Sequence, residues 1–180
     1  MGLLDWHKDT GGIDVNSLGL IERVLLACDG TLTDTVEAVF LEPIQLVKLN
    51  VTSYLAPAPV EDLAVKKGAP IMRRAVLLQG ANTKTNYVYA QTLIALDALP
   101  QQFRLELESS DNPIGRLWVQ HKLETRKELV KIWRVPSSDV SLYFGEAGQA
   151  GLLARSYRVF NSQKPIMLIT EYFPATLTPR

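Results

Sequence analysis

Residues 153–173 read LARSYRVF-NSQK-PIMLITEYF, and this stretch indicates the fold more clearly than the rest of the chain. Two apolar segments, 153–160 and 165–173, flank a short polar turn, which is the pattern of two paired antiparallel strands. The second segment carries one carboxylate, Glu171, after mostly apolar residues. A buried carboxylate without a partner is strongly unfavourable, so Glu171 needs a cation, a hydrogen-bond donor or a ligand beside it.

Arg73 and Arg74 precede an equally apolar segment, AVLLQG at 75–80. Neighbouring strand residues point to opposite faces, so only one of the two arginines can face a pocket. An arginine and a carboxylate on separate apolar strands suit a small anionic ligand that also carries a hydroxyl. The guanidinium would bind the ligand's carboxylate through two hydrogen bonds, and the protein carboxylate would orient the hydroxyl.

Both charged residues also have a purely structural interpretation. Arg74 can extend to solvent or join a surface ion pair. Glu171 can pair with Arg155 or Arg158, which lie on the adjacent segment of the hairpin. Charged residues with shifted pKa values occur in functional sites and in structural ion pairs alike, so the residues alone leave the two interpretations open.

The remaining chain alternates strand-like and helix-like segments. Strands are expected at 44–54, in a hairpin formed by the Arg74 segment with 87–94, and at 124–133. Helices are expected at 13–28 and 33–41, a helix or turn at 100–107, and a tight path through Pro113 and Gly115 at 112–117. Strands joined by short turns, with most helices in the N-terminal half, predict a single α+β domain, residues 1–180, built on a twisted antiparallel sheet.

The composition excludes several classes of protein. The 180 residues are 47% hydrophobic, and Lys plus Arg number 19, as do Asp plus Glu, so no net charge holds the chain on nucleic acid or an anionic membrane. Cys28 is the sole cysteine, and His7 and His121 are the sole histidines, which excludes an internal disulfide and argues against a metal site. The chain has neither the pattern of a signal peptide nor an apolar run of membrane-spanning length, so a soluble cytoplasmic protein is expected.

Two short motifs have a structural explanation. CDGTLTD at 28–34 resembles the first motif of haloacid-dehalogenase-like phosphatases, but Ala27 stands where that family has its nucleophilic aspartate. The motif is better explained as a turn between helices. His121 with Glu124 and Glu128 has near-helical spacing, yet one histidine among basic residues is more often a solvated face than a metal site.

Five segments follow the order and spacing of one known family. They are RAVLL at 74–78, NPIGRL at 112–117, ETR at 124–126, GQAGLLARSY at 148–157 and KPIMLITEYFP at 164–174. From about residue 25 to the C-terminus the sequence resembles the chorismate lyase family. It departs from that family at Ala75, where many relatives have Glu, and at Ile114, where Leu is usual.

The resemblance implies an enzyme that converts chorismate to 4-hydroxybenzoate and pyruvate, the first step towards a quinone ring. Loss of the enolpyruvyl group makes the ring aromatic, so the substrate itself carries the driving force. The protein has mainly to hold a reactive conformer and stabilise developing charge. The resemblance also implies a monomer that needs no cofactor and no metal.

The resemblance assigns a role to each of four residues. Arg74 would bind the ring carboxylate and Glu171 the ring hydroxyl, while backbone groups near Leu32 and Ile114 would complete the substrate contacts. Mobile flaps would cover the product and slow its release. The candidate covers are the loop 56–70 and the region of Leu32.

Two questions stay open at the level of sequence. The second carboxylate of chorismate would need another cation, and Arg155, Arg126 and Arg158 are the candidates. The quinone that the product serves, ubiquinone or plastoquinone, and the position of the hydroxyl on the benzoate are not determined by these residues.

An alternative comes from a different class of protein. The UTRA effector domains of GntR-type regulators resemble chorismate lyase in fold and bind small molecules without converting them. They normally follow a DNA-binding domain, for which the chain has too few residues before Asp29. The sequence therefore favours the enzyme over a non-catalytic domain that binds an aromatic acid.

Overall fold

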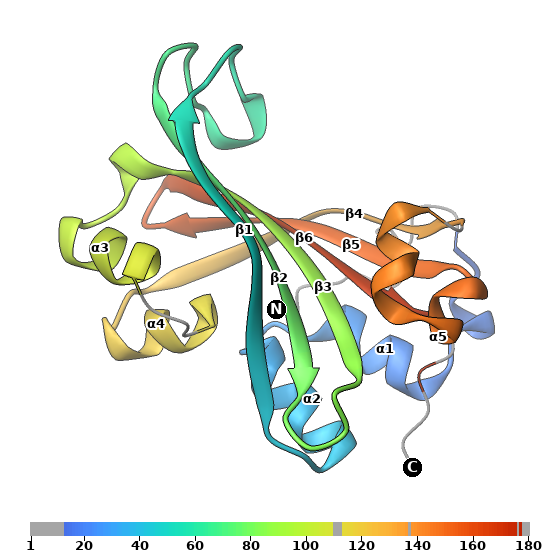
Figure 1. The fold of residues 1–180 in the computed structure, drawn as a ribbon. Coiled ribbons are helices and arrows are strands. Elements are labelled where there is room, and N and C mark those ends of the chain that lie inside the picture. Colours follow the sequence, from blue (N-terminus) through green and yellow to red (C-terminus); the bar gives the residue numbers. More distant parts are fainter. Residues whose placement is uncertain (1–12, 110–112, 137, 176, 178–180) are drawn as a thin grey trace.

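The computed structural model describes residues 13–109, 113–136, 138–175 and 177. Its centre is one twisted sheet in the order β1-β2-β3-β6-β5-β4, in which every neighbouring pair is antiparallel (Figure 1). The strands are β1 (Ile44–Leu55), β2 (Pro70–Gly80), β3 (Asn86–Ala95), β4 (Thr125–Val135), β5 (Leu152–Asn161) and β6 (Lys164–Pro174). This arrangement confirms the predicted antiparallel α+β fold.

Short helices precede and connect the strands. The α-helices are α1 (Leu20–Ala27), α2 (Leu32–Phe40), α3 (Gln101–Ser109), α4 (Ile114–Gln120) and α5 (Glu146–Gln149). The 3-10 helices are η1 (Val15–Ser17), η2 (Glu61–Leu63), η3 (Leu96–Ala98) and η4 (Asp139–Phe144). The first three α-helices lie at the three places where the sequence predicts helical structure. None of the helices in the described ranges is long and apolar enough to cross a membrane.

The last hairpin has the predicted form. A two-residue turn, Ser162 and Gln163, joins β5 to β6, and Ser162 adopts the left-handed conformation with φ of 54°. The register pairs Arg155 with Glu171, which places these two side chains on the same face of the sheet. The hairpin thereby brings a cation next to the carboxylate of β6.

The segment after α3 differs from the prediction. Pro113 and Gly115 predict a tight turn, but Pro113 is the N-cap of α4 and Gly115 lies in its first turn. Proline is tolerated at the start of a helix because the first N–H groups have no partner within the helix. Ile114, Leu117 and Trp118 follow at helical spacing, and the first two are buried. Asn112 lies outside the described residues.

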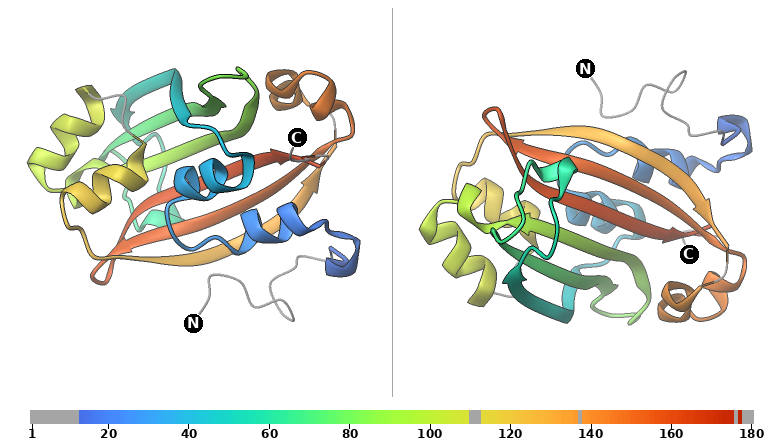
Figure 2. Two further views of the ribbon diagram at one scale, coloured as in Figure 1. Left: turned by 90° about the horizontal axis from the view of Figure 1, so that it is seen from below. Right: turned by 90° about the horizontal axis from the view of Figure 1, so that it is seen from above.

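Helices α1, α2 and α4 lie on one face of the sheet, which we call the helical face (Figure 2). Helices α1 and α2 pack on one end of it, where Leu25, Leu32 and Val36 contact a buried cluster that includes Leu78 and Phe173. Burial of these side chains fixes the two helices against β2 and β6.

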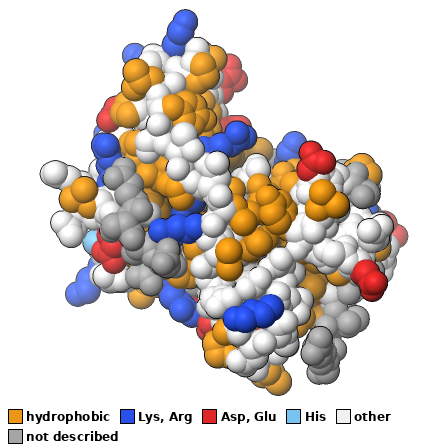
Figure 3. Space-filling view, viewed as in Figure 1, with side chains coloured by type: hydrophobic (Ala, Val, Ile, Leu, Met, Phe, Trp, Pro, Cys, Tyr) orange, Lys and Arg blue, Asp and Glu red, His pale blue; other side chains and the backbone are white. Residues whose placement is uncertain are grey.

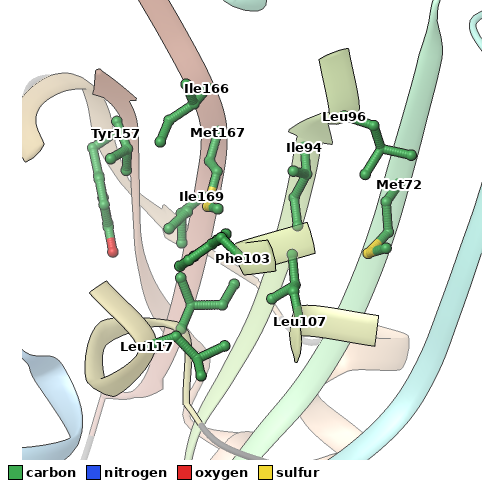
Figure 4. Close-up of a cluster of buried hydrophobic side chains, with 12 residues drawn as sticks. Met72, Ile94, Leu96, Phe103, Leu107, Leu117, Tyr157, Ile166, Met167 and Ile169 are labelled. Atoms are coloured by element: carbon green, nitrogen blue, oxygen red, sulfur yellow. The ribbon is translucent and has the colours of Figure 1, made fainter. Parts of the chain in front are cut away.

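Helices α3 and α4 pack on the other end of the helical face. Phe103, Leu107 and Leu117 are nearly inaccessible to solvent and belong to one cluster with Ile94 and Ile169 of the sheet (Figure 4). The helical face is therefore covered by two separate pairs of helices. The space between the pairs is where the pocket described below lies.

The opposite face of the sheet is covered only in part. Phe144 of η4 and Leu152 pack there with Leu77 and Tyr89. In Figure 3, which shares the view of Figure 1, hydrophobic side chains gather near the middle of the molecule with Lys and Arg side chains beside them. The segment 56–70 projects away from the end of the sheet that carries α1 and α2 (Figure 1).

Candidate active site

A pocket opens on the helical face between α2 and α4. It encloses about 560 Å³, counting the solvent in its mouth, and side chains from all six strands line it. Arg74, Glu171, Leu32 and Ile114, the four residues that the sequence analysis singles out, all line this one pocket.

The alternation of β2 places Arg74 in the pocket. Arg74 is 2% exposed and shares its face with Val76 and Leu78, which also line the pocket. Arg73 is exposed and borders a hollow on the other face of the sheet. The two arginines therefore face opposite sides of the sheet, and Arg74 is the one that faces the pocket between α2 and α4.

Glu171 lies at the centre of a buried hydrogen-bond network. It is 4% exposed, and its two carboxylate oxygens accept hydrogen bonds from Arg155 Nε at 2.6 Å and from the Tyr157 hydroxyl at 2.7 Å. Each carboxylate oxygen can accept a second hydrogen bond, so the group keeps acceptor capacity towards the pocket. Glu171 thus has Arg155 as an ionic partner, one of the two arginines expected from the sequence, and it lines the pocket as well.

Arg155 connects this network to α1. Its side chain is fully buried, and Nη1 donates to the carbonyls of Leu26 and Cys28, each at 2.9 Å. Burial lowers the pKa of Arg155, but the charge and hydrogen bond of Glu171, together with Tyr157 and Cys28, outweigh this effect and the pKa is raised. Arg155 therefore stays charged and holds the end of α1 on the sheet.

Tyr157 remains a hydrogen-bond donor for the same reason. Burial, and then the negative charge of Glu171, raise the pKa of Tyr157 well above its usual value. The phenol keeps its proton, and its hydroxyl donates to Glu171. Arg155 and Tyr157 together orient the carboxylate from the β5 side, and its pocket side stays available.

The three arginines considered for a second anionic group do not reach the pocket. Arg155 is committed to Glu171, while Arg126 and Arg158 both form ion pairs with Glu128. None of the three is among the described residues that line the pocket. The assignment of the second cation to one of them is therefore corrected.

Lys127 of β4 lines the pocket instead. Its ammonium donates to the carbonyls of Asp29 and Gly30, at 2.6 and 2.7 Å. Burial is the main cause that lowers the pKa of Lys127. The sequence offered little signal for this residue, because it lies in a run of charged residues, Arg126 to Glu128, where alternation does not reveal the inner face.

The starts of α2 and α4 both line the pocket. A Cβ atom on Gly115 would lie 3.0 Å from Thr31 Cγ2, so glycine permits the close approach of the two helices. Arg116 of α4 contacts Glu37 of α2 at 2.9 Å, which ties the helices on the outside. Leu32 lines the pocket, whereas the loop 56–70 contributes no residue to the lining.

The described residues offer no alternative metal centre. They contain no group of three or more His, Cys, Asp and Glu side chains that could hold a metal ion. His121 lies with its Nε2 2.6 Å from the Glu106 carboxylate and its ring against Phe103. The charged and polar side chains that line the pocket can supply charge stabilisation, hydrogen bonding and positioning.

Several solved structures that share this fold are those of transcription regulators. The effector domain of PhnF from Mycobacterium smegmatis aligns with a TM-score of 0.61 at 12% identity, covering 84% of this chain and 94% of that one. A GntR-family transcriptional regulator from Bacillus cereus aligns with a TM-score of 0.56 at 12% identity, covering 76% of this chain and 96% of that one. At these identities the likeness concerns the fold alone.

Sequence relatives are more specific. The chorismate pyruvate-lyase of Mycobacterium tuberculosis (strain CDC 1551 / Oshkosh) is 30% identical over 166 residues, 89% of this chain and 82% of that protein. The chorismate pyruvate-lyase of Mycobacterium leprae is 29% identical over 165 residues, 88% of this chain and 77% of that protein. The pattern of the family described as chorismate pyruvate-lyase Rv2949c-like matches residues 26–179. The chain therefore belongs to the Rv2949c-like chorismate pyruvate-lyase family, as the resemblance in its sequence predicts.

Proposed function

We propose that this protein converts chorismate to 4-hydroxybenzoate and pyruvate in the pocket between α2 and α4. The observation that carries the proposal is the placement of two buried charged groups, Arg74 and Glu171, in one pocket with apolar walls. Membership of the chorismate pyruvate-lyase family supports the same reaction.

The reaction needs little chemistry from the protein. The bond between C3 of the ring and the enolpyruvyl oxygen breaks, the hydrogen at C4 leaves as a proton, and a C3–C4 double bond completes the aromatic ring. The released enolpyruvate takes up a proton at its methylene carbon and becomes pyruvate. Atoms and electrons balance without an external oxidant or reductant, so positioning and charge stabilisation are the contributions required of the pocket.

The two charged residues would hold opposite ends of the ring. Arg74 would bind the ring carboxylate through paired hydrogen bonds, and Glu171 would accept a hydrogen bond from the hydroxyl at C4. The arrangement of Arg155 and Tyr157 supports this role, because both occupy the β5 side of Glu171. An acceptor fixed at the hydroxyl would select the ring orientation in which the C4 hydrogen and the ether oxygen can leave.

The walls would set the plane of the ring. Val76, Leu78 and Ile169 line the pocket between the charged groups. Backbone groups near Leu32 and Ile114 would close the site from the helix side, since both residues line the pocket. The 4-hydroxybenzoate released would supply the ring of a quinone.

A second candidate follows from the fold. Its likeness to the effector domain of PhnF suits a domain that binds an aromatic acid and does not convert it. The two candidates differ in one observable, because the binding domain leaves the ether bond of chorismate intact.

Product analysis tests the proposal. Purified protein treated with a chelator is mixed with chorismate, and pyruvate and the hydroxybenzoates are separated by chromatography. The proposal predicts equal amounts of pyruvate and 4-hydroxybenzoate in excess of a control without protein. Intact chorismate together with measurable binding of 4-hydroxybenzoate would favour the binding domain, and 3-hydroxybenzoate would reject the assigned ring orientation.

A further inference from the structure

Two of the described residues that line the pocket carry a positive charge, Arg74 and Lys127. Arg74 belongs to β2 and Lys127 to β4, and the strand order places β3, β6 and β5 between them. Glu171 belongs to β6, the middle one of these three strands. The pocket therefore has a cation on each side of a central carboxylate.

The Lys127 ammonium is held at the pocket wall. Its Nζ lies 5.4 Å from the ring centre of Tyr157 and 6.0 Å from that of Trp118, and both rings belong to pocket-lining residues. Two of its hydrogen bonds go to the carbonyls of Asp29 and Gly30. An ammonium has three N–H donors, so one remains for a ligand.

The charge of Lys127 is not neutralised within the described part of the chain. The lysine forms no ion pair with any described carboxylate, in contrast to Arg155 and Arg158. Burial lowers its pKa, the charge of Glu171 raises it, and that of Arg155 lowers it again. A half-buried cation with these neighbours would be stabilised by an anion in the pocket.

We propose that Lys127 binds the carboxylate of the enolpyruvyl side chain of chorismate. The inference rests on the proposed function, since it assigns the second end of the same substrate. Chorismate carries two carboxylates, and Arg74 serves the one on the ring. A second cation across the sheet holds the side chain that leaves, which fixes the ether oxygen beside the ring carbon from which it departs.

The assignment separates substrate from product. 4-Hydroxybenzoate has only the ring carboxylate, so its binding depends on Arg74 and not on Lys127. A purely structural Lys127, which only fastens the turn at Asp29 and Gly30, would instead affect both ligands alike. The difference between the two ligands is therefore the quantity to measure.

A thermodynamic cycle isolates the contact. One axis is Lys127→Met, and the other is chorismate against its monomethyl ester at the enolpyruvyl carboxylate. Both ligands are compared as kcat/KM, from the rate of 4-hydroxybenzoate formation, where the ether bond is cleaved, and as Kd by calorimetry where it is not. We expect the original protein to prefer chorismate over the ester by roughly 10- to 100-fold, the range for one charge-assisted hydrogen bond. In Lys127→Met the preference should fall to within about threefold, the level of a neutral contact.

Controls keep the test interpretable. Lys131→Met removes an exposed lysine of the same strand, which stacks on Trp133, and should leave the preference unchanged. Lys127→Arg keeps the charge and should retain most of the preference, and it serves if Lys127→Met does not fold. The Kd for 4-hydroxybenzoate should change by less than about threefold in Lys127→Met, because this ligand has no second carboxylate for Lys127 to bind.

The outcomes distinguish this inference from the proposed function. An undiminished preference in Lys127→Met overturns the inference, and so does an equal loss of affinity for chorismate and 4-hydroxybenzoate. A protein that binds chorismate without releasing pyruvate contradicts the proposed function. The cycle then still reports, through Kd, whether Lys127 contacts the side-chain carboxylate.

Discussion

Glu171, which is 4% exposed, accepts hydrogen bonds from Arg155 and Tyr157. A carboxylate in such a place is unfavourable alone, and the Arg155 guanidinium compensates its charge. Arg155 in turn binds two carbonyls at the end of α1. The same contacts that keep Glu171 in position for a ligand therefore contribute to the folded state.

This network predicts a difference between two arginines of β5. Arg155→Met leaves the Glu171 charge buried without its cation, and we expect the free energy of unfolding to fall by about 3 to 5 kcal/mol. Arg158→Met breaks only the partly exposed pair with Glu128 and should cost less than about 1 kcal/mol. Urea denaturation of both variants measures the difference. Equal losses would show that the Arg155–Glu171 pair is not the dominant contact.

A second prediction concerns Arg74 and its neighbour. Arg74→Met should weaken binding of 4-hydroxybenzoate by roughly 100-fold or more, because two charge-assisted hydrogen bonds to the ring carboxylate are lost. Arg73→Met removes an exposed arginine from the other face of the sheet, and this variant should bind 4-hydroxybenzoate as tightly as the unmodified protein does. Calorimetric titration gives both values. The assignment of Arg74 fails if its variant binds as well as that of Arg73 while both melt at the same temperature.

Among the secondary-structure elements, the β2–β3 turn is fastened by Glu42, which lies just after α2. Its carboxylate accepts hydrogen bonds from the Tyr87 hydroxyl, the backbone N–H groups of Asn82 and Thr83, and the Thr83 hydroxyl. A Cβ atom on Gly80 would lie 2.4 Å from Glu42 Oε1, so only glycine leaves room for this arrangement. Glu42 lies between α2 and β1, so these contacts hold the β2–β3 turn against the segment that joins α2 to β1.

The contact predicts a pH dependence of stability. The hydrogen bond from Tyr87 is the main cause that lowers the pKa of Glu42 from 4.5 to about 2. A lowered folded-state pKa means that this stabilisation is present above pH 4.5 and is lost as the pH falls towards about 2. Glu42→Gln should be less stable at pH 7 and should lose less stability on acidification.

Urea midpoints from pH 7 down to about 2.5 test this expectation, because that range spans most of the titration. Glu61→Gln, which changes an exposed carboxylate of η2, is the control and should behave as the unmodified protein. If the curve for Glu42→Gln runs parallel to that of the unmodified protein, the carboxylate of Glu42 does not carry the acid sensitivity.

At the scale of the whole molecule, the pocket depends on the order of the strands. Strand β6 pairs with both β3 and β5, so Glu171 comes to the middle of the sheet with Arg74 on one side and Lys127 on the other. The two pairs of helices cover the ends of the helical face and leave its middle open. The site is thus a property of the complete sheet and of no single hairpin.

Much of this architecture could be predicted from local patterns. Alternation and turn residues located β1, β3 and the β5–β6 hairpin, because period-two patterning and short polar turns act over a few residues. Helix α4 was not predictable in the same way, since Pro113 and Gly115 are typical of turns and also occur at helix starts.

The site was predictable only in its outline. Arg74 and Glu171 stand out as charges within apolar segments, and the structure brings both to one pocket. Lys127 could not be recognised, because its position beside the pocket depends on the pairing of β4 with β5 and on the carbonyls of a distant turn. The choice between a structural and a functional Glu171 was a false alternative, since it has both a partner and a place in the lining.

The most direct test of the central claim is the rate of pyruvate release from chorismate by the unmodified protein, Arg73→Met and Arg74→Met side by side. We expect pyruvate and 4-hydroxybenzoate in equal amounts from the first two proteins. We expect a rate at least roughly 100-fold lower from Arg74→Met, the effect of losing a paired charge-assisted contact. Absence of pyruvate from the unmodified protein, or an undiminished rate in Arg74→Met, would contradict the account.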